Sequence, residues 1–410
     1  MKKARGYQEM ASEWIKPFKR IIEEGGIVGV PTETVYGLAV NALDYNAVDS
    51  LYELKGRPAV KPMAIMVSGI DKAAAYCTDI PSPAYLLAEK FWPGPLTIVL
   101  KSNGKVAENV TAGGDTIALR CPDCGLTLQL LRELDVPVAV PSANPSGMEA
   151  AVTAEEVIAY FPSGIGGVID GGPSREGVAS TIVSLANSEE GKYSILREGA
   201  LPPENIEKCL FDSVRLIGIT GTTGSGKTTA LKIFEEEGIP GIDCDALYHE
   251  MLDNNEALLS DIESAFPEAF RGGVLNRKAL GDIVFCDPGK LNRLNEITHA
   301  RVLEEIRKQV VSYALKGKRA VAIDAIALFE SGLGGICCKT VSFTADKASR
   351  TERITSRDGI SADYAGKRVS AQKEDSYYIE NSNINIENNG TLEEFKEKVR
   401  RCIKEEIFCE

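Results

Sequence analysis

VRLIGITGTTGSGKTT, residues 214–229, contains the spacing G-x-x-x-x-G-K-[ST]. The run before Gly221 is short, apolar and β-branched, and residues 229–237 have a helical pattern, so the glycines fall where a strand turns into a helix. Glycines at such a turn let backbone N–H groups and the helix N-terminus face phosphates, while Lys227 neutralises them and the Thr228 hydroxyl ligates Mg²⁺. The stretch therefore predicts an ATP-binding domain whose phosphate contacts come from Gly224, Ser225, Gly226, Lys227, Thr228 and Thr229.

The position of this motif also indicates how the chain is divided. A chain of 410 residues exceeds the usual size of one domain, and the motif begins halfway along it. The stretch GALPPENIEKCLFDS, residues 199–213, has two prolines and a short helical pattern just before the motif. We therefore predict a first domain over residues 1–208, a linker over 209–213 and a second domain over 214–410, both of them α/β because strands and helices alternate throughout.

Composition limits the environment and the partners. The net charge of −13 divides into −8 up to Asp212 and −5 beyond it, so neither half has the basic excess that stable nucleic-acid binding requires. No apolar run approaches the roughly 18 residues that span a membrane. The ten cysteines have no disulfide-framework spacing, which favours reduced thiols. These features predict a cytoplasmic protein without a membrane segment.

The first half lacks both a phosphate-binding loop and a histidine, so its chemistry must rest on other groups. Polar clusters stand at the edges of apolar strands: PTETVYGLA (31–39), KGRPAVKPM (55–63), WPGPLT (92–97), TIALRCP (116–122), PSANPSG (141–147) and GVASTIV (177–183). They supply cations suited to phosphates and carboxylates and short neutral hydrogen-bonding groups. Each cluster alone is also ordinary turn chemistry or a solvated charge, so their combination carries the argument.

In combination and order these clusters resemble the YrdC family of threonylcarbamoyl-AMP synthases, over nearly all of residues 10–200. The K-x-R and S-x-N arrangement, here Lys55, Arg57, Ser142 and Asn144, matches the family signature. The resemblance implies a twisted mixed sheet with helices, and formation of threonylcarbamoyl-adenylate and pyrophosphate from L-threonine, bicarbonate and ATP, the first step of t6A modification of tRNA. Proteins of tRNA modification would then be partners.

The same resemblance implies roles for individual residues. Thr34, Arg120 and Ser180 would hold threonine, and Lys55 and Arg57 would be catalytic. The ATP-binding set would be Arg57, Lys61, Thr116, Ser142, Asn144 and Arg197. Negative charge accumulates on both reactants when a carboxylated threonine amine attacks the α-phosphorus, so positioning and cation clamps suffice without a covalent nucleophile. Met66 and Cys124 stand where many relatives have histidines.

Residues beyond the motif favour a small-molecule kinase in the second half. Asp243 and Asp245 follow a short strand, close to where a phosphate-accepting hydroxyl would lie, and one of them could act as a general base or orient Mg²⁺. The alternative for either carboxylate is a cap on the helix that follows. Arg350, Arg353 and Arg357 recur at helical spacing, which fits either a lid over the phosphates or a solvated helix face.

The motifs GITGTTGSGKTT, IDCDAL, ITHARV, IDAIALFESGL, SRTERITSRDGIS, KRVSAQ and IENNGT together resemble dephospho-CoA kinase over about residues 214–407. The resemblance implies a doubly wound parallel sheet with a lid and MgATP-dependent phosphorylation of the ribose 3′-hydroxyl of dephospho-CoA. Asp245 would be the catalytic base, Asp243 its neighbour, Lys227 the phosphate binder and Arg350 to Arg357 the lid. Ala300 and Ile326 depart from the family's His-Pro and D-x-P-L-L-F-E patterns.

We therefore expect a bifunctional enzyme whose two halves share ATP as a substrate and Mg²⁺ as its companion ion. The alternative is an active kinase joined to a non-catalytic first half that senses threonine or nucleotide, which the residue Met66 motivates. Binding of double-stranded RNA by the first half is a further alternative, and its charge of −8 weighs against it.

Overall fold

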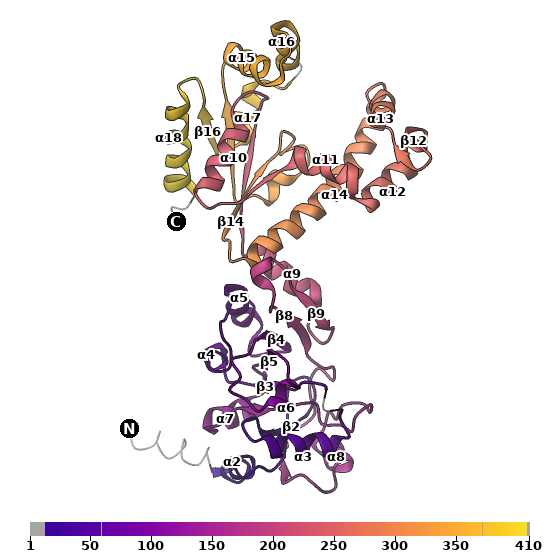
Figure 1. Ribbon diagram of the computed structural model, residues 1–410, viewed down its shortest axis with the longest axis vertical. Coiled ribbons are helices and arrows are strands. Elements are labelled where there is room, and N and C mark those ends of the chain that lie inside the picture. Colours follow the sequence, from indigo (N-terminus) through magenta and orange to yellow (C-terminus); the bar gives the residue numbers. More distant parts are fainter. Residues whose placement is uncertain (1–12, 59, 371, 408–410) are drawn as a thin grey trace. The chain divides into compact units, whose positions relative to one another are not determined.

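The computed structural model describes residues 13–58, 60–370 and 372–407 and divides the chain into two compact units (Figure 1). The first unit comprises Met1–Leu210 with Leu315–Gly317, and the second comprises Phe211–Ala314 and Lys318–Glu410. Helix α9, Pro203–Asp212, contains the change from one unit to the next, so most of the predicted linker is helical. None of the helices in the described part of the chain has the length and apolar character needed to cross a membrane.

The first unit is built on a mixed sheet of nine strands in its described residues, which confirms the predicted twisted mixed sheet. In spatial order the strands are β7 (Gly167–Val168), β1 (Val28–Val30), β2 (Gly37–Asn41), β6 (Val138–Ala139), β3 (Ala64–Met66), β5 (Thr116–Arg120), β4 (Leu96–Lys101), β8 (Thr181–Ser184) and β9 (Ser194–Arg197). The helices are α2 (Lys16–Glu23), α3 (Tyr45–Lys55), α4 (Ile70–Ala73), α5 (Ser82–Phe91), α6 (Glu108–Thr111), α7 (Gly125–Glu133) and α8 (Ala154–Tyr160).

The register of the central strands brings one row of side chains together. Arg120 on β5 pairs with Met66 on β3 and with Thr97 on β4. Thr97 pairs in turn with Ile182 on β8, whose partner on β9 is Arg197. Because directly paired residues point to the same face of a sheet, this row aligns Arg120 and Arg197 across three strand interfaces. Arg120, predicted to bind threonine, and Arg197, predicted to bind ATP, therefore lie on the same face of the sheet.

Helix α3 positions the K-x-R motif through its two ends. Asp44 caps its N-terminus by accepting hydrogen bonds from Asn46 N and Ala47 N. Gly56 ends the helix in the left-handed conformation, with φ of 57°, which glycine adopts without the strain of a Cβ. Lys55 is thus the last residue of the helix, and Arg57 follows the reversal of the chain.

The second unit has a five-stranded sheet in which every pairing is parallel, as predicted for a doubly wound fold. The spatial order is β11 (Gly241–Asp243), β14 (Ala320–Asp324), β10 (Arg215–Gly221), β15 (Lys339–Thr344) and β16 (Ile384–Glu387). Ile217, Ile219, Val341 and Phe343 pack against α10 (Lys227–Glu236) and α18 (Leu392–Cys402), which form one core. In Figure 1 these two helices lie on one side of the sheet.

The remaining elements extend from the carboxyl ends of the strands. One group follows β11 and consists of α11 (Cys244–Asn254), α12 (Glu256–Ala265), the hairpin β12 (Phe270–Arg271) and β13 (Val274–Leu275), α13 (Arg277–Val284) and the long α14 (Pro288–Leu315). The predicted helix near 290–316 corresponds to α14. The lid region after β15 consists of α15 (Lys347–Asp358), α16 (Ala362–Ser370) and α17 (Asp375–Asn381). Ligands of open parallel sheets bind at this edge, where the two groups meet the P-loop.

Candidate functional site

In the second unit the P-loop lies between β10 and α10. Gly221, Gly224 and Gly226 have φ values of 131°, 83° and 107°, which side chains with a Cβ rarely adopt. Gly226 is the N-cap of α10, so Lys227, Thr228 and Thr229 form its first turn. A cavity of about 540 Å³ opens above the loop. Its lining includes all the predicted phosphate-binding residues of the loop except Ser225, whose buried hydroxyl has no hydrogen-bond partner.

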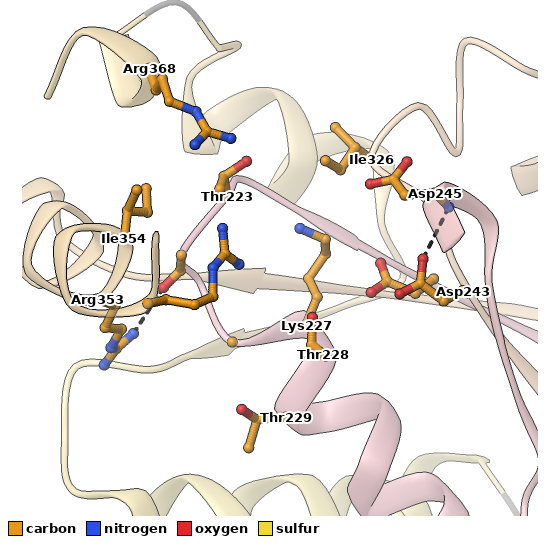
Figure 2. A pocket seen from close by; sticks show the side chains of 14 residues that line it. Thr223, Lys227, Thr228, Thr229, Asp243, Asp245, Ile326, Arg353, Ile354 and Arg368 are labelled. Atoms are coloured by element: carbon orange, nitrogen blue, oxygen red, sulfur yellow. Dashed lines mark hydrogen bonds between the residues drawn. The ribbon is translucent and has the colours of Figure 1, made fainter. Parts of the chain in front are cut away.

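Carboxylates line the opposite wall of this cavity, and Figure 2 shows Lys227 extending between them and the lid residues. Asp243 caps α11 through hydrogen bonds of 3.0 Å from the N–H groups of Asp245 and Ala246. The capping alternative thus holds for Asp243, while the carboxylate of Asp245 accepts no hydrogen bond from the described residues and lines the cavity. Asp324, the first residue of the stretch compared with D-x-P-L-L-F-E, ends β14 directly beside Asp243 in the register and was not predicted as a site residue.

Burial and charge shift the ionisation of these groups. Burial raises the pKa of Asp324 to about 7, opposed by Lys227 and assisted by the two neighbouring carboxylates. Burial also raises the pKa of Asp245, with Asp243 acting in the same direction. The pKa of Lys227 is lowered by burial, and the surrounding carboxylates limit this decrease. A buried lysine among three carboxylates is a site poised to receive a charged ligand and a cation.

The predicted lid arginines occupy three different environments. Arg350 is buried, forms an ion pair of 3.5 Å with Asp375 and is not among the cavity-lining residues. Arg353 lines the cavity, but its guanidinium donates to the carbonyl of Gly224 in the P-loop and to the carbonyl of Asn388 after β16. Arg357 and Arg368, the latter in the stretch KRVSAQ, both line the cavity and both pair with Asp358. The helix is thus neither a solvated basic face nor a uniform clamp.

A second cavity of about 190 Å³ adjoins the first, and Asp245 and Ile326 line both. Tyr248 and His299 lie on its wall together with Cys244 and Ser331. Burial lowers the pKa of His299, with Glu330 opposing, so the imidazole is shifted toward its neutral form. The carboxylate of Asp245 therefore lies between a charged cavity and a smaller one of mixed polarity.

In the first unit the K-x-R and S-x-N motifs meet. The Lys55 ammonium donates to the carbonyls of Ser142 and Asn144, and the Ser142 hydroxyl donates to Asn144 Oδ1 at 2.6 Å. Arg57 donates to the carbonyls of Lys61 and Pro62 at 3.3 and 2.9 Å. Lys55 thus fixes the turn that carries Ser142 and Asn144, while Arg57 holds the segment that carries Lys61.

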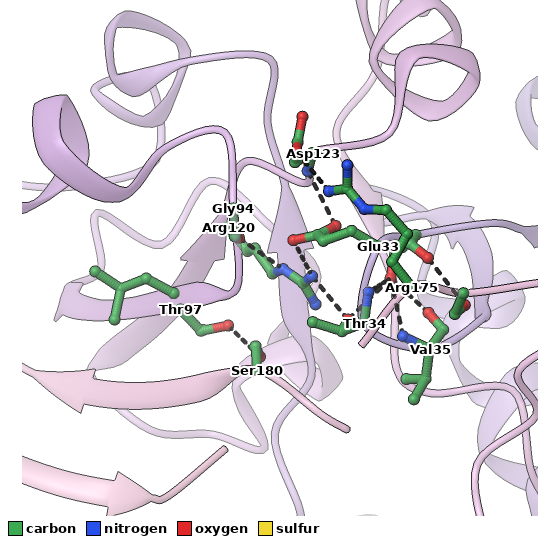
Figure 3. Close-up of polar contacts among 12 residues, drawn as sticks. Glu33, Thr34, Val35, Gly94, Thr97, Arg120, Asp123, Arg175 and Ser180 are labelled. Atoms are coloured by element: carbon green, nitrogen blue, oxygen red, sulfur yellow. Dashed lines mark hydrogen bonds and ion pairs between the residues drawn. The ribbon is translucent and has the colours of Figure 1, made fainter. Parts of the chain in front are cut away.

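A buried ion pair organises the predicted threonine group (Figure 3). Arg120 donates to Glu33 Oε1 and to the Thr34 hydroxyl, each at 2.8 Å, and both charged side chains are less than a tenth exposed. The second carboxylate oxygen of Glu33 accepts a bond of 3.0 Å from Asp123 N. The sequence analysis did not name Glu33, although it lies within the PTETVYGLA cluster. Met66 is buried beside Arg120 in the strand register, so it faces this group.

The third part of this site links Ser180 to Arg197. Arg197 donates to the carbonyl and the hydroxyl of Ser180, and the Ser180 hydroxyl lies 2.9 Å from that of Thr97. Burial lowers the pKa of Arg197, and the nearby charges of Arg120 and Arg57 act in the same direction. The charges of Arg120 and Arg57 thus oppose that of Arg197, and an anion bound beside Arg197 would offset this repulsion.

Thr116 lies on the same strand as Arg120 but at the opposite end. It is the first residue of β5 and pairs with Lys101, whereas Arg120 is the last. At the rise of a strand this separation is roughly 13 Å. A ligand that touches both ends would have to be elongated, as ATP is.

Lys55 makes the stability of the first unit depend on pH. Burial, assisted by the charge of Arg57, lowers the pKa of Lys55 from 10.5 to about 8. Between these values the unfolded chain binds a proton that the folded unit has released, so the free energy of unfolding rises with pH. Relative to Lys55→Met, wild type should gain up to roughly 3 kcal/mol between pH 8 and 10.5.

This gain is measurable by urea unfolding followed by tryptophan fluorescence. Both tryptophans of the chain, Trp14 and Trp92, belong to the first unit, so the signal reports that unit alone. Parallel pH dependences of wild type and Lys55→Met would contradict the assigned pKa.

Comparison with known proteins gives a match for each unit. The model of the Sua5/YciO/YrdC family, described as telomere recombination, matches residues 20–199, and that of dephospho-CoA kinase matches residues 215–394. A dephospho-CoA kinase of Dehalococcoides mccartyi is 34% identical over 196 residues, which are 47% of this chain and 98% of that protein. A threonylcarbamoyl-AMP synthase of Mus musculus is 32% identical over 197 residues, 46% of this chain and 69% of that protein.

The chain belongs to both families. This confirms the two resemblances found in the sequence. A threonylcarbamoyl-AMP synthase of Pyrococcus abyssi is 43% identical over 204 residues, which are 50% of this chain. The chain spans 59% of that relative and 54% of a Bacillus subtilis relative of the same name, little more than half of each. Below, the first unit is called the YrdC-like unit and the second the dephospho-CoA kinase unit.

Proposed function

We propose that the chain is a bifunctional enzyme that forms threonylcarbamoyl-AMP in residues 1–208 and phosphorylates dephospho-CoA in residues 214–410, with 209–213 between them. The observation that supports the kinase activity is the pair of cavities that share Asp245. One cavity presents a P-loop lysine and arginines for the phosphates of ATP, and the other has room for part of an acceptor. A carboxylate between donor and acceptor is where a general base must stand.

In the proposed kinase reaction the ribose 3′-oxygen of dephospho-CoA attacks the γ-phosphorus of ATP. The bond from that phosphorus to its bridging oxygen breaks, ADP leaves, and the hydroxyl proton passes to Asp245. Lys227 and the cavity-lining Arg357 and Arg368 hold the phosphoryl oxygens, so that charge is stabilised as it moves. Oxygen ligands suit Mg²⁺, and Thr228 and Asp324 supply a hydroxyl and a carboxylate on the cavity wall.

The described residues contain no group of three or more side chains that could hold a metal by themselves. This agrees with an ion that enters with ATP, because Mg²⁺ keeps several waters and usually takes one or two carboxylates plus substrate phosphates. When bound, the ion would neutralise charge on the β- and γ-phosphates.

The observation that supports synthase activity is the row of paired residues that carries both Arg120 and Arg197, with the charge of Arg57 acting on Arg197 as well. In the proposed reaction the threonine amine and bicarbonate give a carbamate and water. A carbamate oxygen then attacks the α-phosphorus of ATP and pyrophosphate leaves. Every step gathers anions, so cationic donors and fixed hydroxyl groups supply what catalysis needs.

Two assays on the intact protein test these activities separately. Threonine, bicarbonate and MgATP should yield threonylcarbamoyl-AMP and pyrophosphate, and dephospho-CoA with MgATP should yield CoA and ADP. If one activity yields no product under conditions in which the other activity does, the proposal is wrong for the inactive half.

Replacing Arg120 with lysine should impair the synthase selectively. Lysine keeps the positive charge but lacks the two separate nitrogens through which Arg120 bonds Glu33 and Thr34 with Nη2 and the Gly94 carbonyl with Nε. We expect pyrophosphate release to fall about 100-fold, with a raised KM for threonine and unchanged CoA formation. Arg132→Lys, an exposed position on α7, is the control. Unchanged synthase kinetics in Arg120→Lys would contradict the proposed role of this site.

A second candidate for the YrdC-like unit is binding without catalysis. Met66 favours it, because a thioether faces Arg120 where many relatives would offer an imidazole. Calorimetry that detects threonine or ATP binding, with no adenylate formed at any substrate concentration, would support this function over the synthase.

A further inference from the structure

Two carbonyl oxygens of the P-loop accept hydrogen bonds from side chains far along the chain. Arg353 on α15 donates to the Gly224 carbonyl at 3.2 Å. Asn388, which follows β16 in the motif IENNGT, donates to the Ser225 carbonyl at 2.9 Å. Arg353 also donates to the Asn388 carbonyl at 2.8 Å. The two side chains thus form one connected brace on the loop.

The brace determines which way the loop's N–H groups point. In a trans peptide the C=O and the following N–H point in opposite directions. Holding the carbonyls of Gly224 and Ser225 toward the brace therefore turns the N–H groups of Ser225 and Gly226 to the other side, where the Ser225 N–H donates to the Thr222 carbonyl at 3.2 Å within the loop. N–H groups of a P-loop cradle the α- and β-phosphates of a nucleotide.

The packing around Asn388 shows that this contact is built into the loop. Asn388 is 7% exposed. A Cβ on Gly226 would lie 2.4 Å from the Asn388 side-chain nitrogen, so only glycine lets the amide approach. Gly224 packs less tightly against α15, where a Cβ would lie 3.0 Å from the carbonyl oxygen of Arg350. The loop therefore packs against Asn388 at one glycine and against α15, the helix that carries Arg353, at the other.

We propose that Arg353 and Asn388 are positioning residues that orient the P-loop N–H groups for the phosphates shared by ATP and ADP. The inference rests on the proposed kinase function and refines it. It removes Arg353 from the set of arginines that close over the γ-phosphate. Arg357 and Arg368 also line the cavity, and within the described residues both pair with Asp358 and neither bonds the P-loop.

An arginine that contacts the γ-phosphate and an arginine that braces the P-loop would affect ADP binding differently. Loss of a γ-phosphate contact weakens the binding of ATP and leaves the binding of ADP unchanged, because ADP lacks that phosphate. Loss of a brace weakens both equally, because the misdirected N–H groups serve the phosphates that the two nucleotides share. The KM for ATP and the inhibition constant of ADP, both measured on CoA formation, report only the kinase unit.

Asn388→Asp removes the donor while keeping the shape of the side chain, and it places a carboxylate against the Ser225 carbonyl. We expect the KM for ATP and the inhibition constant of ADP to rise together about tenfold, with the KM for dephospho-CoA unchanged. Asn389→Asp is the control, because it makes the same charge change next door and keeps the acceptor for Asp346 N. Its constants should equal those of wild type.

Arg353→Lys provides a second variant that keeps the charge but cannot reach both carbonyls. It should show the same equal rise for ATP and ADP, with circular dichroism confirming that each variant is folded. A rise confined to ATP would make Arg353 a phosphate ligand and overturn the inference. Unchanged constants in both variants would also overturn it, whereas wild type that forms no CoA would overturn the kinase proposal itself.

Discussion

Replacing Lys227 with alanine is expected to reduce CoA formation by at least about 1,000-fold while leaving pyrophosphate release from threonine, bicarbonate and ATP unchanged. Lys227 is 9% exposed, and its ammonium donates to the Thr222 carbonyl at 3.3 Å. The charges of Asp324, Asp245 and Asp243 all act on Lys227 and keep its ammonium protonated. Without this ammonium, the negatively charged phosphates of ATP would be repelled by the three carboxylates.

The selectivity of this substitution follows from the two separate sites. The YrdC-like unit contains no part of the P-loop, so its reaction provides an internal measure of correctly folded protein. Lys232→Ala, on the exposed face of the same helix, is the matched control and should retain both activities. Loss of both activities in Lys227→Ala would show that the units are coupled and would contradict independent catalysis.

Replacing Asp245 with asparagine is expected to lower the kcat of CoA formation between about 100- and 10,000-fold, with little change in the KM for ATP. The amide has the size of the carboxylate but cannot accept the proton of the ribose hydroxyl. Asp243→Asn should be milder, because asparagine caps a helix as well as aspartate does and the bonds to α11 survive. Equal losses in the two variants would argue against a specific base at Asp245.

The pH dependence of the wild-type kinase adds a second measurement. Because burial and Asp243 raise the pKa of Asp245, the base is protonated at a pH where an ordinary aspartate is still charged. The kcat should therefore fall, as the pH decreases, around a pKa above the usual value of about 4. Asp245→Asn should lack this acidic limb.

Local patterns predicted the elements whose residues lie close together in the sequence. The P-loop, the capped helix after Asp243 and the long helix α14 are each specified within one segment, through glycine spacing, a capping side chain and apolar periodicity. The strand β2, Gly37–Asn41, was not predicted, because its first three residues belong to the cluster PTETVYGLA, which was interpreted for its polar residues. The short β9 gave no signal because most of its side chains are exposed.

These local patterns could not predict contacts between residues that are far apart in the sequence. Glu33 looked like one polar residue among several until strand register and loop packing brought it to Arg120. Asp324 did carry a usable signal, because it ends an apolar strand as Asp243 does, and the carboxyl ends of parallel strands share an edge. Arg368 belongs to the quoted stretch KRVSAQ, but only the packing of α16 on α15 brings its side chain to the cavity.

The close fit of Gly226 against Asn388 has a consequence for how sequence variation in this protein should be interpreted. A P-loop is usually recognised as eight consecutive residues, but here its shape is a joint property of that motif and a segment near the C-terminus. A substitution at position 388 would leave the recognisable motif intact and still weaken the binding of ATP and ADP. Gly226 and Asn388 are therefore expected to show epistasis, each setting which residues the other position tolerates.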